Sequence, residues 1–171
     1  MTLARRIPWV LAGAALAHVA AVQMLPRFIV YVVRHRLERA VGVNHILHSP
    51  LPDSTWHTIV MPSPDLLYSV CAYNVSDRPL LVTADVPQGY WSVSAFADNT
   101  DNFFVQNDRT ASHGRVRVVF SSQPGFKDPD RGVVVQVPSS TGIILFRQLV
   151  LDRNELARAQ QIQNGATCAP L

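Results

Sequence analysis

The stretch LLYSVCAYNVSDRPL, residues 66–80, carries the signals that decide the fold. Residues 66–75 are rich in apolar and aromatic side chains, and the SDRP that follows them is typical of a turn after a β-strand. Cys71 lies in this predicted strand, and Cys168, the other of the two cysteines in the chain, lies close to the C-terminus. The position of these two cysteines bears on both the fold and the compartment of the protein.

Short apolar runs separated by turn signals continue through the rest of the chain. In one of them Val116, Val118 and Phe120 alternate with Arg115 and Arg117, the pattern of a half-buried strand. Such spacing is typical of a β-sandwich or an open barrel. We therefore predict a mainly β domain, a compact antiparallel sandwich or open barrel, with seven strands near residues 66–75, 79–86, 90–97, 103–108, 115–120, 132–137 and 143–150.

A short helix is predicted to close the domain. Asp152 is a good N-cap residue, and Glu155 three positions later completes a capping-box pattern. Asn164 and Gly165 suit the C-terminal end of a helix. This helix would lie on the sandwich and carry Cys168 back toward the strands.

The N-terminal segment has the length of a membrane span. Residues 7–25, IPWVLAGAALAHVAAVQML, contain no charged residue and would extend about 28 Å as a helix. Arg5 and Arg6 precede the segment, and Pro26 and Arg27 end it. A cleaved signal peptide is the alternative, but its apolar core is normally shorter and a small-residue cleavage site follows it. We expect an uncleaved signal anchor and a lipid bilayer as its partner.

Small residues recur at four-residue spacing within this segment. Gly13, Ala17 and Ala21 would form one stripe on a helix, and such stripes let two membrane helices approach closely. An alanine-rich anchor also produces this spacing by chance. A homodimer or a membrane-protein partner bound through this stripe is a hypothesis.

The sequence divides into an anchor at residues 1–26, a juxtamembrane segment at 27–62 and a β-rich domain at 63–171. The start of the middle segment could form an amphipathic helix lying along the membrane surface, or a helical stalk that packs on the domain. The Pro- and His-rich stretch at 45–57 is expected to be irregular. Its histidines, His45, His48 and His57, lack a completing carboxylate or thiolate, so we expect no metal site.

Composition excludes several functional classes. The net charge of +3 comes largely from arginines before residue 40, beside the apolar segment, which is typical of lipid contact rather than of nucleic-acid binding. None of the common hydrolase, metalloprotease, nucleotide-binding or dinucleotide-binding motifs is present. Asp98 and Asp101 lie in a predicted turn, which they are expected to serve. We predict no catalytic residues and no cofactor.

One group of polar residues is a candidate site. Asn107, Asp108 and Arg109 follow a predicted strand and could hold the next loop, or form a polar site at the rim of the sandwich. Arg147 interrupts an apolar strand, so it either faces solvent or pairs with a buried acid. With these four residues, the candidate site would include the aromatic hydroxyls of Tyr68 and Tyr90.

Several stretches together resemble the small membrane-anchored branch of the domain-of-unknown-function 1254 family. They are PSPDLLYSVCAYNVSDRPL at 62–80, YWSVSAFADNTDNFFVQNDR at 90–109, VPSSTGIILFRQLV at 137–150, and the short helix before Cys168. Ser63 departs from the pattern, because longer members often carry Asn there. The resemblance implies an N-terminal membrane helix and a compact β-rich domain, and it implies no particular reaction.

The resemblance includes both cysteine positions. An even number of cysteines in an exported domain favours a Cys71–Cys168 disulfide, and disulfides persist in the periplasm but are rare in the cytosol. The alternatives are a buried Cys71 with a free thiol at Cys168, or a catalytic thiol. The arginine count, two before the apolar segment and four after it, favours a cytoplasmic domain instead.

We therefore expect a single-pass inner-membrane protein of the bacterial envelope whose β-rich domain faces the periplasm. Its expected role is that of a binding or scaffolding module. The alternative is a small-ligand binder or an enzyme that acts at the membrane surface.

Overall fold

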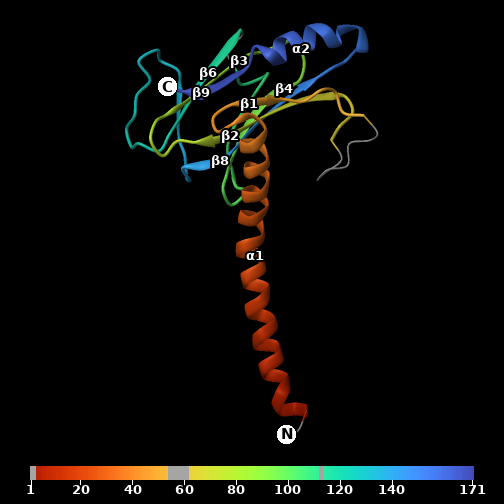
Figure 1. The fold of residues 1–171 in the computed structure, drawn as a ribbon, viewed down its shortest axis with the longest axis vertical. Helices are drawn as coiled ribbons and strands as arrows, with labels where there is room; N and C mark the ends of the chain where they lie inside the picture. Colours follow the sequence, from red (N-terminus) through yellow and green to blue (C-terminus); the bar gives the residue numbers. More distant parts are fainter. Residues whose placement is uncertain (1–2, 54–61, 112–113) are drawn as a thin grey trace.

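The N-terminal apolar segment forms one long helix that projects from the rest of the molecule (Figure 1). The structure is a computed structural model that describes residues 3–53, 62–111 and 114–171. Helix α1 runs from Leu3 to Val41 and passes through Pro26, so the prediction that the helix ends there is wrong. Proline removes one backbone donor from a helix interior. Arg27 adds a donor nearby, because its Nη1 donates to the carbonyl of Gln23 at 2.8 Å.

Within the described residues, nine strands form two sheets. The five-stranded sheet has the order β1-β2-β8-β4-β5 and is antiparallel throughout. The four-stranded sheet has the order β7-β6-β3-β9. The strands of the first sheet are β1 (Ile46–His48), β2 (Leu66–Asn74), β8 (Thr141–Leu149), β4 (Trp91–Ala97) and β5 (Asn102–Asn107). Those of the second are β7 (Val133–Gln136), β6 (Arg115–Ser121), β3 (Leu80–Asp85) and β9 (Thr167–Pro170).

The inner faces of the two sheets enclose the main core. Ile144 of β8, Val93 of β4 and Phe120 of β6 are fully buried in it. Tyr73 of β2 stacks on Phe120 with ring centroids 6.5 Å apart, and its hydroxyl donates to the carbonyl of Ser139. Burial raises the pKa of Tyr73 to about 12, so this hydroxyl stays protonated at neutral pH. The predicted mainly β sandwich is confirmed.

A disulfide joins the two sheets. Cys71 of β2 and Cys168 of β9 are bonded, with their Cα atoms 6.6 Å apart and both side chains buried. Cys168 pairs with Val82 of β3, so the residue predicted to lie on a tail belongs to a strand of the four-stranded sheet. The predicted pairing of the two cysteines is the one that the structure contains.

Three features of the sheets differ from the prediction. Residues 46–48, predicted to be irregular, form β1 because they pair with 69–71 of β2. β9 also exists through pairing with β3 rather than through its own sequence. β7 pairs with β6 in parallel, because the loop between them brings the chain back to the end of the sheet where β6 begins. All three features depend on pairing between strands that are distant in the sequence, and the local sequence gives little indication of this pairing.

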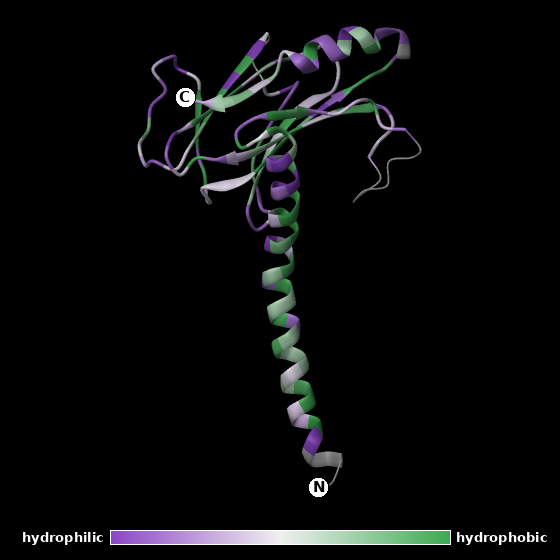
Figure 2. Cartoon of the chain, in the orientation of Figure 1, coloured by the Kyte–Doolittle hydropathy of each residue, from purple (hydrophilic) through white to green (hydrophobic). Residues whose placement is uncertain are grey.

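The C-terminal part of α1 packs on the domain, where it contacts β1, β2 and β8. Val30 is 5% exposed, whereas Trp9 and Leu16 in the N-terminal part are 80% and 73% exposed. Of the two alternatives for this segment, the helical stalk agrees with the structure. Figure 2 shows apolar residues around most of the projecting part of α1 and hydrophilic residues close to the domain.

Helix α2 (Leu156–Asn164) follows a single 3₁₀ turn at Arg153–Glu155. Asp152 caps this turn rather than α2, because its Oδ1 accepts the backbone N–H of Asn154. The predicted capping box is therefore wrong, whereas Gly165 ends α2 as predicted. Gln163 of α2 is buried, and its Nε2 donates to the carbonyls of Ser49 and Tyr68. These bonds tie α2 to the β1–β2 end of the five-stranded sheet.

Candidate functional site

Four side chains from four neighbouring strands form a row across the five-stranded sheet. Tyr68 of β2 is paired with Arg147 of β8, Arg147 with Ser92 of β4, and Ser92 with Asn107 of β5. Side chains directly opposite each other in an antiparallel pair have Cβ atoms about 4.5–5.5 Å apart. The register therefore brings together three residues of the predicted polar site and adds Ser92, which the sequence analysis did not single out.

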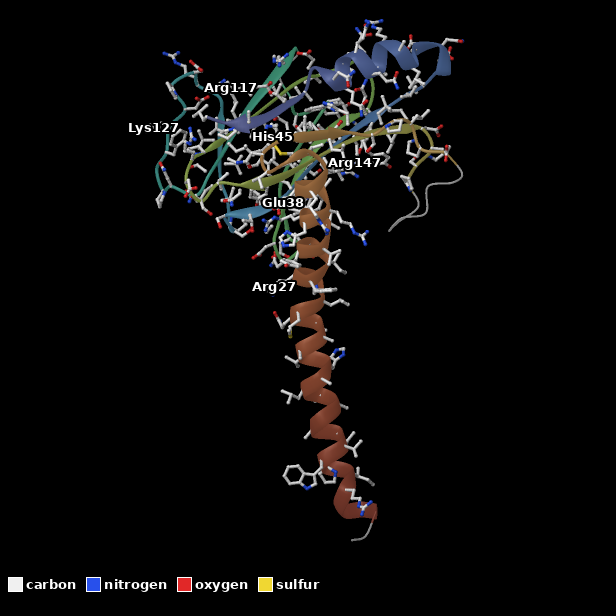
Figure 3. The ribbon with its side chains drawn as sticks, viewed as in Figure 1. Arg27, Glu38, His45, Arg117, Lys127 and Arg147 are labelled. Carbon is white, nitrogen blue, oxygen red and sulfur yellow. A yellow bond between two sulfur atoms is a disulfide. The ribbon has the colours of Figure 1, made fainter. Side chains whose placement is uncertain are left out.

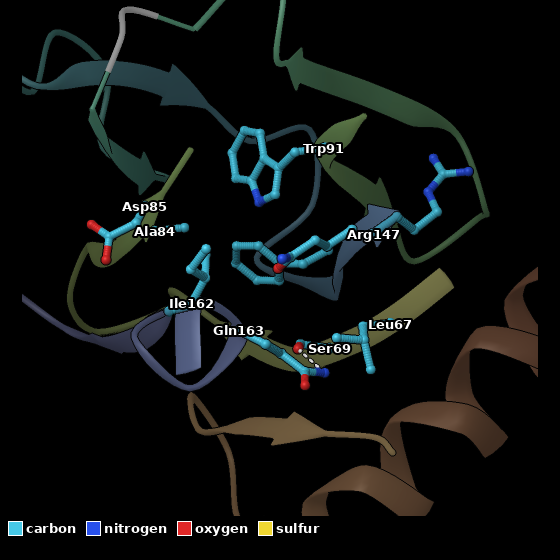
Figure 4. Close-up of a pocket in the computed structure, with 11 residues that line it drawn as sticks. Leu67, Ser69, Ala84, Asp85, Trp91, Arg147, Ile162 and Gln163 are labelled. Carbon is cyan, nitrogen blue, oxygen red and sulfur yellow. Dashed lines mark hydrogen bonds between the residues drawn. The ribbon is translucent and has the colours of Figure 1, made fainter. Parts of the chain in front are cut away.

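This row lies on the outer face of the sheet. In β8 the buried Phe146 and Ile144 point into the core, and Arg147 alternates with them. In β4 Trp91 and Val93 belong to the core, so Ser92 and Ser94 point outward. Figure 4 shows the side chain of Arg147 extending from β8 away from Trp91 and Ile162. α1 contacts three strands of this same sheet, β1, β2 and β8.

Arg147 has few partners. Its Nη2 donates to Ser94 Oγ at 3.3 Å, which is a long hydrogen bond. Its Nε is buried and has no hydrogen-bond partner in the structure. Among the described residues no carboxylate forms an ion pair with it. The guanidinium therefore has no counter-charge among the described residues, and its shielded Nε has no acceptor.

Hydroxyl groups surround this arginine on the outer face. Tyr90, just before β4, and Ser92 have their hydroxyl oxygens 3.3 Å apart. The Tyr68 hydroxyl accepts the backbone N–H of Ser63 at 3.0 Å, which leaves its own hydrogen free to donate. Because Ser63 contributes its backbone, the departure from Asn at this position does not affect the contact. Ser92 and Ser94 are 3% and 0% exposed.

The NDR sequence at 107–109 serves a turn. Asn107 Oδ1 accepts the backbone N–H groups of Arg109 and Thr110, and Asp108 Oδ1 accepts the N–H of Trp91 at 3.4 Å. The side chain of Arg109 is exposed. Of the two roles considered for this group, holding the turn agrees with the structure. Asp98 and Asp101 likewise lie at the β4–β5 turn, where Asp101 accepts a bond from Asn99.

Two hollows border α2 beside the same strands, and Arg147 contributes to the lining of the first. One is a cavity of about 10 Å³ enclosed by Trp91, Ser69 and Gln163, room for a single water molecule (Figure 4). The other is an open groove of about 290 Å³ between α2 and the β3–β4 turn, where Glu155 and Arg158 face Gln88. Although Arg147 contributes to the lining of the first hollow, Figure 4 shows its guanidinium extending away from Trp91 and Ile162.

The four-stranded sheet holds the most strongly perturbed carboxyl group. Arg117 Nε donates to Asp128 Oδ2 at 2.7 Å and its Nη2 lies 2.9 Å from Asp130 Oδ2. The hydrogen bond from Arg117, helped by the backbone N–H of Gly132, lowers the pKa of Asp128 to about 2. This arrangement fastens the loop after β6.

Two of the histidines considered as metal ligands contact neighbouring protein groups. His48 Nδ1 is 2.8 Å from Ser69 Oγ, and His45 Nδ1 is 2.8 Å from the carbonyl of Val43. Burial lowers the pKa of His48. His57 lies outside the described residues. The described residues contain no cluster of three metal-ligating side chains.

Comparison with known proteins agrees with this architecture. Residues 43–170 match the family described as "Protein of unknown function (DUF1254)", and the chain belongs to this family. The matched region begins just after α1 and ends in β9, so it contains both sheets, the disulfide and the polar row. The family resemblance noted in the sequence is thereby confirmed.

Two solved structures resemble the chain. The VPA0106 protein from Vibrio parahaemolyticus matches 88% of this chain with a TM-score of 0.66 and 16% identity, which indicates a shared fold. An uncharacterised protein from Burkholderia cenocepacia matches 63% of the chain with a TM-score of 0.48 and 18% identity. This chain spans about a third of each, 35% and 31%. No curated protein matches the sequence.

Proposed function

We propose that the protein is a single-pass inner-membrane protein of the cell envelope, whose β-rich domain is a binding module held at the membrane surface. The observation that carries this proposal concerns helix α1. Its N-terminal part is apolar and exposed, whereas its C-terminal part packs on the domain. The region from Arg6 to Val41 is long and apolar enough to cross a membrane, and 6% of its most apolar window is buried. Lipid would cover the side chains that the domain leaves exposed.

The continuity of α1 supports a fixed distance between membrane and domain. The apolar segment ends near Pro26, and Val30, only about 6 Å further along the helix, is already buried against the domain. The five-stranded sheet would then lie close to the lipid headgroups. This favours a module that acts on membrane-associated molecules over one that reaches far from the bilayer.

The disulfide supports a periplasmic domain. Oxidised cysteine pairs persist in the periplasm and are rare in the cytosol. The arginine distribution favours the opposite orientation, but that bias concerns short flanking segments, whereas whole domains are translocated largely regardless of charge. We therefore give the covalent bond more weight.

A reporter cysteine tests the orientation. Lys127 is exposed at the end of the domain far from α1 (Figure 3), so Lys127→Cys adds one accessible thiol to a chain whose own cysteines are bonded. A membrane-impermeant maleimide should label this variant in intact spheroplasts, and the wild-type chain should label only after unfolding and reduction. Labelling of the variant only after lysis would place the domain in the cytoplasm and refute the proposed orientation. Carbonate extraction of the same membranes tests the anchor, because a spanning chain stays in the membrane pellet.

An enzyme or small-ligand binder at the membrane surface is the second candidate function. The observation that favours it is the outer-face row at Arg147, since a half-buried cation beside four hydroxyls could hold an anionic ligand. The catalytic thiol considered as an alternative to the disulfide finds no support, because both cysteines are bonded to each other.

A further inference from the structure

We infer that Arg147 is the centre of an oxyanion-binding site on the outer face of the five-stranded sheet, which takes a phosphate or carboxylate group. Its other members are Ser92, Ser94, Tyr90 and Tyr68. The inference deepens the proposed binding role by naming the chemistry of the ligand. It does not depend on the orientation of the domain in the membrane.

Arg147 lacks a counter-charge among the described residues. Of the arginines whose side chains the structure describes, Arg34, Arg117 and Arg147 are the ones that are not exposed. Arg34 is paired with Glu38 at 2.7 Å, and Arg117 with Asp128 at 2.7 Å. Arg147 has no such partner among the described residues, although a charge withdrawn from water normally has one. A bound anion would supply it.

The surroundings of Arg147 also favour an anion. The neighbours of Arg147 along the outer face of its own strand are Leu145 and Leu149, which contribute no charge. The paired strands contribute hydroxyl groups, each of which can rotate its hydrogen toward an anion. Asp108, beyond the end of the row, uses one carboxylate oxygen on the backbone of Trp91. A single positive charge among donors selects an oxyanion over a cation or a neutral ligand.

One donor of the Arg147 guanidinium has no acceptor. Nη2 reaches Ser94, whereas Nε has no partner. A carboxylate or phosphate accepts two parallel bonds from an arginine, one of them from Nε. The lone hydrogen bond to Ser94 holds the side chain in place without consuming that second donor.

The oxyanion could come from a lipid headgroup or from a soluble anion, and one experiment separates these sources. The full chain in detergent is unfolded by heat at pH 7 and constant ionic strength. The additions are sodium phosphate, sodium acetate, or mixed micelles containing phosphatidylglycerol or phosphatidylcholine, with sodium chloride as the reference. The variants are Arg147→Gln, Arg147→Lys, and Arg115→Gln as the matched control. Arg115 is paired with Asp85 on the other sheet, so its loss changes the net charge equally.

We expect at least one anion to raise the Tm of the wild-type chain by about 3–6 °C when present at ten times its Kd. Arg115→Gln should respond like wild type, Arg147→Lys less, and Arg147→Gln not at all. A response to phosphate or acetate identifies a soluble ligand, and a response to phosphatidylglycerol alone identifies a headgroup. Without added anion, Arg147→Gln should unfold at or above the wild-type Tm, because an unpaired charge is removed. A purely structural arginine would lower it.

Two results would overturn the inference: no anion stabilises the wild-type chain, or Arg147→Gln is stabilised as much as wild type. If Arg147→Gln does not fold, ³¹P line broadening of inorganic phosphate or phosphatidylglycerol by wild type and Arg147→Lys decides, and equal broadening by both contradicts a forked arginine contact. The labelling of Lys127→Cys is independent of these results, so the site and the membrane orientation can fail separately.

Discussion

Arg117 and Arg147 point outward from central strands of the two sheets and are both partly buried, but their partners differ. On the four-stranded sheet Arg117 has Asp128 and Asp130, both from the loop that follows its own strand. On the five-stranded sheet Arg147 has one serine hydroxyl and an unused Nε. One sheet satisfies its outer arginine within the chain, whereas the other leaves charge and donors for a ligand. This difference is the reason to look for function on the five-stranded sheet.

The largest expected effect on stability comes from removing the disulfide that joins the two sheets. The disulfide closes a span of 97 residues between β2 and β9. Cys71→Ala combined with Cys168→Ala should lower the free energy of unfolding by about 4–5 kcal/mol, because the unfolded chain regains conformational freedom. Guanidinium unfolding of the full chain in detergent measures this. Reduction of the wild-type chain should give the same loss, and an unchanged midpoint would show that the bond contributes nothing to stability.

A smaller effect is expected where α2 is fastened to the five-stranded sheet. Gln163 Nε2 donates to two backbone carbonyls and to Ser69 Oγ. Gln163→Leu leaves the Ser49 carbonyl without a donor, whereas the Tyr68 carbonyl keeps the Ser49 N–H and Ser69 Oγ keeps its contact with His48. The substitution should cost about 1–3 kcal/mol. Gln161→Leu, on the exposed side of the same helix, is the matched control and should be nearly neutral. Equal effects of the two substitutions would show that the hydrogen bonds do not stabilise the packing of α2.

Acid should remove the pairing that distinguishes the four-stranded sheet. The pKa of Asp128 in the folded protein is about 2, below its ordinary value near 3.8. The stabilisation is therefore complete above about pH 4 and is lost as the pH falls from about 4 to about 2. Urea midpoints measured from pH 6 to pH 2 should fall over this range in wild type and fall less in Asp128→Asn. Asp130→Asn, at an exposed carboxylate, should behave nearly like wild type, and a parallel decline in all three chains would contradict this role of Asp128.

The smallest effect on the domain is expected from the anchor. Gly13→Leu replaces the first residue of the small-residue stripe, and a Cβ atom built there has open space around it within 4 Å. The stability of the domain should change by less than about 0.5 kcal/mol. If two copies pair through the stripe, crosslinking in membranes should fall for Gly13→Leu but not for Ala14→Leu, its off-stripe neighbour. Loss of crosslinking in both variants, or in neither, would argue against pairing through this face.

The sequence predicts those parts of the fold that local patterns determine. The seven strands with apolar alternation form, and α2 forms with Gly165 at its end. β1 and β9 are not predictable in the same way, since each is short and is made a strand by its partner. The parallel pairing of β7 depends on the path of a long loop. Pro26 also misleads, because a helix with neighbouring donors can continue through proline.

The candidate site is only partly visible in the sequence. Arg147 stands out as a charge in an apolar strand, but its neighbours follow from register, which one-residue shifts would alter completely. Ser92 and Ser94 alternate with core residues of β4, and this alternation in the sequence could have predicted that both serines point to the outer face. Asn107 and Asp108 illustrate the converse problem, because the residues that hold a turn are the same types that hold a ligand.

The unbroken helix also has a consequence for how copies of the protein would be arranged. Because α1 is continuous from its exposed apolar part to its contact with β2, rotation of the helix about its own axis turns the whole domain with it. Two anchor helices that paired along one face would therefore fix the orientation of both domains about the membrane normal. Helix–helix contacts within the bilayer would then determine the direction in which the Arg147 side of each domain faces along the membrane surface.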